Sequence, residues 1–172
     1  GDDKLLIINN QGNIRAVSPE LSLHFEDNTS HIEKWNPIKP LTAVYYDPNK
    51  ERYFVKRFLL EYPDREENFI KKESKLIYLS TEWRPILKII FDKPRGKGQP
   101  VPLEINAETF ISVKGFKASG NQLPDKKIKL IELKEALEYK ESIIPKSHMD
   151  IEVSSDETIP SKDDESQITM EF

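Results

Sequence analysis

The sequence contains no cysteine and only three histidines among its 172 residues. Without thiols the chain can form neither a disulfide nor a thiolate zinc site, which fits a cytoplasmic protein. His24, His31 and His148 are scattered, and none lies beside a matching metal ligand, so we expect no metal site. No apolar run approaches the length of a membrane span, so we expect no membrane contact.

Motifs of catalysis and nucleotide binding are also missing. There is no Gly-x-Ser-x-Gly elbow, and the glycines at 96 and 98 have the wrong spacing for a nucleotide-binding loop. Asp92, Glu104 and Glu108 are candidates for a general acid and base. Surface carboxylates, however, are usually exposed to solvent without a catalytic role. We therefore expect a chain with no catalytic residue, no metal and no cofactor.

Charge is distributed unevenly along the chain. Residues 141–172 hold nine acids and two lysines, a net charge of -7, so residues 1–140 carry +3 of the total of -4. The stretch 154–166 is acidic and has no aromatic residue, and such a segment buries too little apolar area to offset its ordering entropy. We predict a basic binding domain at 1–140 and an acidic, disordered tail at 141–172. Competition of the tail with the ligand of that domain is a hypothesis, and an inert solubilising tail is the alternative. Gly1 in place of Met further indicates a fragment of a longer chain.

Two hairpins are predicted in the first 60 residues. Residues 4–9 and 14–17 flank a turn that contains Gly12, and residues 41–46 and 52–60 flank a turn that contains Pro48. Both faces of the strand at 52–60 are largely apolar, so we expect it to be central in its sheet.

Further strands are expected at 76–80, 86–91, 101–105, 110–113 and 128–133. Residues 132–140 are also compatible with a short helix, and residues 64–74 with a helical turn or a loop. Short strands at fairly even spacing, joined by Gly, Pro and Asn turns, predict an all-β domain. The segments that begin near residues 4 and 76 are candidates for separate blade-like units.

Lysine and arginine at strand ends and turns are the main candidate binding groups. Lys114 and Lys117 bracket Gly115 and Phe116, which places two cations beside an exposed turn. This pattern is typical of a phosphate contact but also of a solvated strand end. The full set chosen as phosphate-binding is Lys56, Arg57, Arg95, Lys97, Lys114 and Lys117. We expect Trp35 and Trp83 to anchor the core instead.

Four segments resemble the C-terminal domain of the A subunit of bacterial type IIA topoisomerase. They begin with Lys4-Leu-Leu-Ile-Ile-Asn-Asn-Gln-Gly-Asn-Ile-Arg15 and Glu33-Lys-Trp-Asn-Pro37, and continue with Tyr53-Phe-Val-Lys-Arg-Phe58 and Phe110-Ile-Ser-Val-Lys-Gly-Phe-Lys-Ala118. The likeness covers about residues 4–135. It is closer to the A subunit of topoisomerase IV or to a gyrase-A-like homologue.

The resemblance implies a β-pinwheel, a propeller-like ring of hairpin blades whose basic rim binds and bends duplex DNA. It further implies a non-catalytic domain of an ATP-dependent type II DNA topoisomerase, a cytoplasmic, nucleoid-associated isomerase that controls DNA topology. The catalytic tyrosine would lie on a domain absent from this chain. The implied partners are duplex DNA, the B subunit of the topoisomerase and a second A subunit.

The chain departs from gyrase at the Gln-Arg-Arg-Gly-Gly-Lys-Gly box. Its nearest stretch, Pro94-Arg-Gly-Lys-Gly98, lacks the second arginine and one glycine. This favours bending of the topoisomerase IV type over wrapping of the gyrase type, and the short chain favours a partial pinwheel of two or three blades. The alternative function is a protein-interaction β domain that docks a topoisomerase or chromosome partner.

Overall fold

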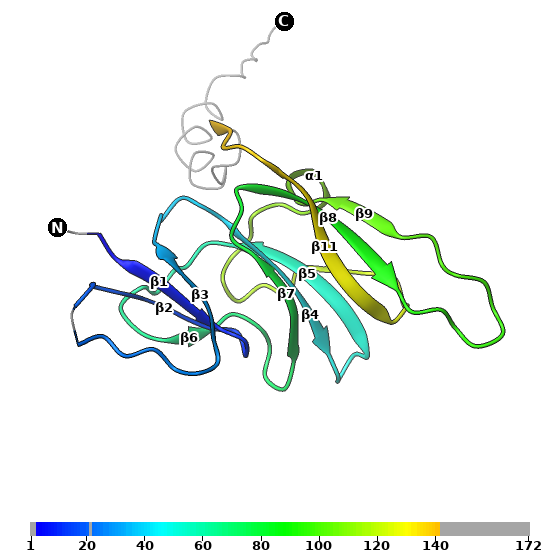
Figure 1. The fold of residues 1–172 in the computed structure, drawn as a ribbon, viewed down its shortest axis with the longest axis horizontal. Helices are drawn as coiled ribbons and strands as arrows, with labels where there is room; N and C mark the ends of the chain where they lie inside the picture. Colours follow the sequence, from blue (N-terminus) through cyan, green and yellow to red (C-terminus); the bar gives the residue numbers. More distant parts are fainter. Residues whose placement is uncertain (1–2, 21, 142–172) are drawn as a thin grey trace, which may run out of the picture. The chain divides into compact units, whose positions relative to one another are not determined.

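The structure is a computed structural model that describes residues 3–20 and 22–141. These residues form three antiparallel sheets with almost no helix, and none of the sheets closes into a barrel (Figure 1). The predicted all-β class is therefore confirmed. No helix in this part of the chain is long and apolar enough to cross a membrane.

The first sheet is built around the predicted N-terminal hairpin. It contains β1 (Leu5–Asn9), β2 (Asn13–Val17), β3 (Thr29–Lys34) and β6 (Glu67–Asn68), in the order β3-β1-β2-β6. The Asn9 side chain accepts hydrogen bonds from the backbone N–H groups of Gln11 and Asn13, both at 3.0 Å. Gly12 adopts a φ of 90°, a conformation that favours glycine, so the turn follows directly from the sequence.

The middle sheet contains the second predicted hairpin. Its strands are β4 (Leu41–Asp47), β5 (Arg52–Phe58), β7 (Lys75–Ser80) and β10 (Asn121–Gln122), in the order β10-β5-β4-β7. Most residues of β4 and β5 are buried on both faces. The prediction that the strand at 52–60 is central in its sheet is thus confirmed.

The third sheet has the order β11-β8-β9. Its strands are β8 (Arg84–Phe91), β9 (Leu103–Asn106) and β11 (Ile128–Leu137). β11 pairs with β8 along its whole length, from Ile128 opposite Phe91 to Leu137 opposite Arg84. The alternative of a helix at 132–140 is therefore wrong for the residues up to Leu137, because this pairing continues the strand.

The strand predicted at 110–113 is not formed. Residues Ala107–Phe110 form the single helical turn α1, and the Asn106 side chain caps it by accepting from the Glu108 backbone N–H at 3.1 Å. The Glu108 carboxylate also pairs with Arg84 at 3.0 Å. These contacts outweigh the short alternating pattern, and a single bridge between Lys114 and Phe58 remains there. Residues 64–74, predicted as a helical turn or a loop, contain the short strand β6.

Two apolar clusters join the three sheets. Tyr45 and Phe58 of the middle sheet pack with Ile8 and Ile14 of the first sheet, together with Phe116. On the opposite face, a separate cluster joins the middle and third sheets through Val44, Val55, Leu87, Ile89 and Phe91. The middle sheet is therefore covered on both faces, as the alternation of side chains along a strand allows.

The two tryptophans have different environments. Trp35 packs against the cluster between the first and middle sheets, which confirms its predicted anchoring role. Trp83 meets Tyr139 edge to face, with ring centroids 4.6 Å apart, and belongs to neither cluster.

Candidate nucleic-acid interface

The six cations predicted to bind phosphate lie in three different environments. Lys56 and Arg57 are on β5 and are only 3% and 2% exposed. Arg95 and Lys97 lie in the loop between β8 and β9, and Lys114 and Lys117 lie between α1 and β10; all four are exposed. The structure therefore does not gather the six into one site.

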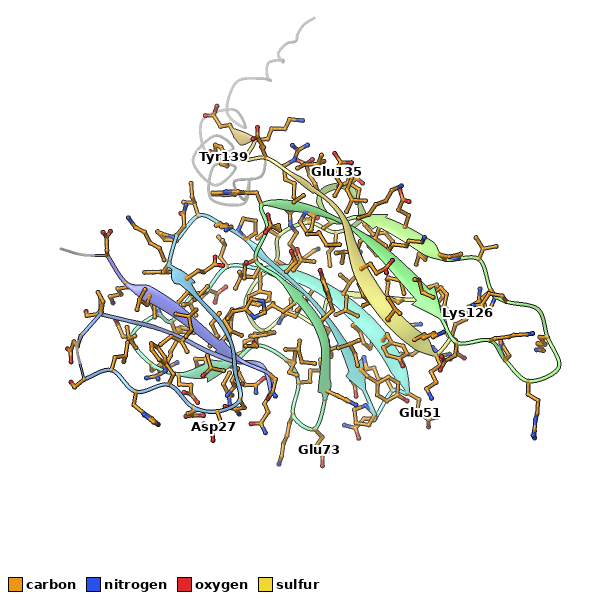
Figure 2. All side chains as sticks on the ribbon, in the orientation of Figure 1. Asp27, Glu51, Glu73, Lys126, Glu135 and Tyr139 are labelled. Carbon is orange, nitrogen blue, oxygen red and sulfur yellow. The ribbon has the colours of Figure 1, made fainter. Side chains whose placement is uncertain are left out.

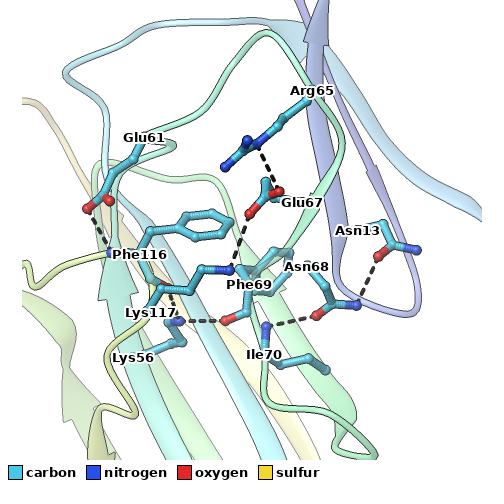
Figure 3. A network of polar contacts seen from close by, with 10 residues as sticks. All are labelled: Asn13, Lys56, Glu61, Arg65, Glu67, Asn68, Phe69, Ile70, Phe116 and Lys117. Carbon is cyan, nitrogen blue, oxygen red and sulfur yellow. Dashed lines mark hydrogen bonds and ion pairs between the residues drawn. The ribbon is translucent and has the colours of Figure 1, made fainter.

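Lys56 is held inside the protein by backbone carbonyl groups. Its ammonium donates to the carbonyl oxygens of Phe69 and Phe116 (Figure 3). It also lies 4.9 Å from the centroid of the Phe58 ring. The pKa of Lys56 is lowered to about 8, mainly by burial and also by the charges of Lys117 and Lys71, which Glu61 opposes. This ammonium joins β5 to two other segments and has little surface for a phosphate.

Arg57 is buried on the opposite side of β5. Its guanidinium donates to the carbonyl oxygen of Trp83 at 2.7 Å. Burial lowers the pKa of Arg57, while Glu108 raises it and Arg84 lowers it. So little of either side chain is exposed that neither Lys56 nor Arg57 presents much surface to a phosphate group.

Lys117 is exposed but already has a carboxylate partner. Its ammonium lies 3.2 Å from Glu67, which also pairs with Arg65 at 3.0 Å (Figure 3). The neighbouring Lys114 is fixed through its backbone N–H, which donates to the carbonyl oxygen of Arg57 at 2.9 Å. This pair is thus a small cationic group beside a partly neutralising glutamate.

Arg95 and Lys97 belong to a larger group of cations. Their loop, residues 92–102, extends from the third sheet (Figure 1) and begins beside the segment that leads into β11. The Asp92 N–H donates to the Lys127 carbonyl oxygen at 2.8 Å, and the Lys127 ammonium lies 3.5 Å from the Asp92 carboxylate. Lys126 lies 5.5 Å from the centroid of the Phe91 ring. These contacts bring Lys126 and Lys127 to the base of the loop.

The β4–β5 hairpin adds cations from the middle sheet. Arg52 pairs with Asp125 at 3.2 Å, and both line a cleft together with Lys75, Lys126 and Lys127. Glu51 and Lys126 lie at the same end of these sheets in Figure 2. We name this end of the middle and third sheets the basic edge, with the cations Lys50, Arg52, Lys75, Lys93, Arg95, Lys97, Lys126 and Lys127.

The basic edge concentrates positive charge. Its eight cations are accompanied by four carboxylates, Asp47, Glu51, Asp92 and Asp125, which leaves a net charge of +4. Residues 1–140 as a whole carry only +3, so the remainder of that segment is slightly acidic. Clustering of cations on one face, more than total charge, is the feature expected of a surface that follows a phosphate backbone.

Of the eight cations at this edge, sequence reasoning selected only Arg95 and Lys97 as phosphate-binding. Arg52, Lys75, Lys126 and Lys127 are separated by up to 75 positions in the chain and meet only because β11 pairs with β8 and the hairpin packs alongside. The adjacent pair Lys126-Lys127, just before a predicted strand, was the one local signal available. In the described part of the chain, no three His, Asp or Glu side chains are placed to hold a metal ion.

The fold and this edge define a class: an all-β domain of stacked antiparallel sheets with cations gathered where two sheets end. The sequence model of a family described as "Topoisomerase C-terminal domain, Bacteroidota" matches residues 1–136. The chain therefore belongs to this family of topoisomerase C-terminal domains, as its resemblance predicted. No curated protein and no solved structure matches the chain. Membership of this family supports the interpretation of the chain as a non-catalytic domain of a topoisomerase.

Proposed function

We propose that this domain binds duplex DNA without sequence preference and bends it, and so guides strand passage by a type IIA topoisomerase in which it forms part of the A subunit. The observation that carries the proposal is the basic edge, with a net charge of +4 in a domain of the topoisomerase C-terminal family. In the full enzyme its partners would be a second A subunit together with the B subunit, in the cytoplasm.

The chemistry of the edge suits phosphate groups more than bases. Lysine and arginine on exposed loops bind phosphate oxygens, which position a protein on DNA but carry no sequence information. Gly96 has a φ of 72°, and no atom lies within 4 Å of where a side chain would begin there. The open turn at Arg95–Lys97 therefore leaves room for close approach of a DNA backbone.

We further propose that the three sheets are successive blades of a partial pinwheel. The middle sheet packs on both neighbours, as an inner blade would. The outer face of the third sheet presents Ile86, Ile90 and Leu130, of which Leu130 is 39% exposed. That face is where a further blade would stack. Cations at the ends of adjacent blades would then bend DNA along the rim.

Charge reversal at the basic edge tests this proposal. In R95E/K97E/K126E the duplex affinity at low salt should fall at least about tenfold, because three phosphate contacts become repulsive. The matched control K34E/K134E/K140E makes the same change in net charge on other exposed positions. Equal loss in both triple variants, measured by fluorescence anisotropy with a labelled duplex, would contradict a specific role for the edge.

We still expect Lys114 and Lys117 to form a second contact with DNA phosphates. The variant K114E/K117E should weaken duplex binding less than R95E/K97E, because Glu67 already partly neutralises Lys117. If K114E/K117E binds duplex at low salt as tightly as the native chain, these two lysines are not part of the interface. The basic edge would then be the one proposed DNA contact.

A second candidate is a domain that binds another protein. Leu130 and Leu133 on β11 and Tyr139 are 39%, 42% and 45% exposed, and β11 is an edge strand. Exposed apolar groups on an edge strand favour contact with a protein. This function predicts no duplex binding at low salt, together with affinity of residues 1–172 for the purified B subunit of the topoisomerase.

A further inference from the structure

A cleft of about 500 Å³ opens between the middle and third sheets at the basic edge. Its walls come from β4, β5 and β7 on one side and from residues 124–127, which lead into β11, on the other. The volume lies within the range of pockets that bind small organic molecules.

Two tyrosines form the aromatic part of this cleft. Tyr46 and Tyr53 are directly opposite each other in the β4–β5 register, on the same face as Val44 and Val55. Their rings meet at an interplanar angle of 62°, with centroids 4.9 Å apart, and Ile77 lies beside them. Both tyrosines remain partly exposed, and an edge-to-face pair leaves ring surface on which a further planar group can pack.

Cations surround these rings. Arg52, Lys75, Lys126 and Lys127 line the cleft with only two carboxylates, Glu51 and Asp125, so the lining has a net charge of +2. Arg52 is held against Asp125 at 3.2 Å. In the described part of the chain, Lys75 and Lys126 have no carboxylate within 4.0 Å, so their charges are available to a ligand.

We propose that this cleft binds a nucleotide unit, with an unpaired base packed against Tyr46 and Tyr53 and its phosphates beside Lys75 and Lys126. Aromatic side chains within a cationic groove are the general means by which proteins hold single-stranded nucleic acid. The domain would then hold a base that leaves the stack where a bound duplex is bent or opened. Such binding goes beyond contact with the duplex backbone, and a separate single strand would bind the cleft without that contact.

The direct test compares two labelled strands of about eight nucleotides, a thymidine oligomer and an abasic oligomer with the same phosphates, bound to the full chain. The thymidine oligomer should bind about tenfold more tightly, because only it has bases to stack. Tyr46→Leu should abolish this preference, whereas Tyr46→Phe should retain it because the aromatic ring remains. Equal affinity of the native chain for both oligomers would overturn the proposal. This comparison uses the native chain alone, so it does not depend on whether a variant folds.

Two further measurements separate this site from the proposed function. A blunt duplex should bind equally to the native chain and to Tyr46→Leu once thermal melting shows that both are folded. A preference for the thymidine oligomer without duplex binding would support the nucleotide site and contradict the proposed duplex function. Duplex binding without that preference would support the duplex function and contradict the nucleotide site. Calorimetry with thymidine monophosphate shows which form of nucleotide the cleft binds. Binding of thymidine monophosphate indicates a free nucleotide as the ligand, and binding of the oligomer alone indicates a DNA strand.

Discussion

At the scale of single residues, the buried ammonium of Lys56 is the most unusual feature. It donates to carbonyl groups in two segments, after β6 and before β10, and so connects both to β5. An unpaired carbonyl group in this position would carry a desolvation cost of about 1–3 kcal/mol. The lysine therefore satisfies polar groups in the region where the first and middle sheets meet.

This environment makes a prediction about pH. The pKa of Lys56 is lowered to about 8 in the folded chain, whereas an unfolded lysine titrates near 10.5. Between these values the unfolded state holds more protons, so the free energy of unfolding should rise with pH from 8 to 9.5, by about 1.5 kcal/mol. Tyr45, whose pKa is raised to about 12, opposes this trend only near and above pH 10.

Urea unfolding at pH 8 and at pH 9.5 measures the effect. The rise should disappear in Lys56→Met and persist in Lys72→Met, which alters an exposed lysine. The same rise in all three proteins would show that another group is responsible.

At the scale of elements, the short strand β10 depends on one glycine. Gly120 has a φ of 90°, and a Cβ atom there would lie 2.1 Å from the Val55 carbonyl oxygen and 2.8 Å from the Lys56 Cβ. Only glycine permits β10 to pair so closely with β5. The glycine at position 120 thus has a structural explanation.

Gly120→Ala should lower the free energy of unfolding by at least about 2–3 kcal/mol, because backbone strain and a clash with β5 add together. Gly96→Ala is the matched control, since Gly96 also has a positive φ but meets no atom within 4 Å. It should cost only about 1–2 kcal/mol, from the backbone conformation alone. Similar losses for both variants in urea unfolding would contradict the close approach.

Local sequence patterns predicted hairpins better than isolated strands. Both hairpins have turn residues whose geometry is set locally, at Gly12 and at Asp47, which accepts from the Asn49 N–H at 2.9 Å. The strand predicted at 110–113 failed because the cap at Asn106 stabilises a helical turn. β3, β6 and β10 were not predicted, since two of them have only two residues and β3 contains a single large apolar residue, Ile32.

The candidate site was predictable only in part, for a similar reason. Arg95 and Lys97 stand out in sequence as cations in a glycine loop, and they are indeed exposed. Lys56 and Arg57 look like surface charges on a strand, but they lie inside because their strand is covered on both faces. Arg52 and Lys75 join the edge through tertiary packing, which no local pattern indicates.

At the scale of the whole molecule, the charge of the chain is divided between its two parts. Residues 1–140 carry +3 with a basic edge, and residues 141–172, which lie outside the described residues except for Glu141, carry -7. An acidic segment tethered to a basic domain competes with DNA at a high effective concentration. This remains a prediction from sequence alone.

Truncation after Lys140 tests that competition. The shortened chain should bind duplex more tightly than residues 1–172, and the difference should shrink as salt screens both interactions. Unchanged affinity and an unchanged salt dependence would show that residues 141–172 do not compete with DNA.

The central claim is that the basic edge binds the phosphate backbone of duplex DNA. A salt titration of binding to a labelled duplex of about 40 base pairs, for residues 1–172 and for R95E/K97E/K126E, tests it most directly. We predict that affinity of the native chain falls steeply with salt, and that the triple variant has a slope shallower by about 0.9 for each phosphate that is no longer neutralised. No binding at low salt, or equal slopes for both proteins, would contradict the account.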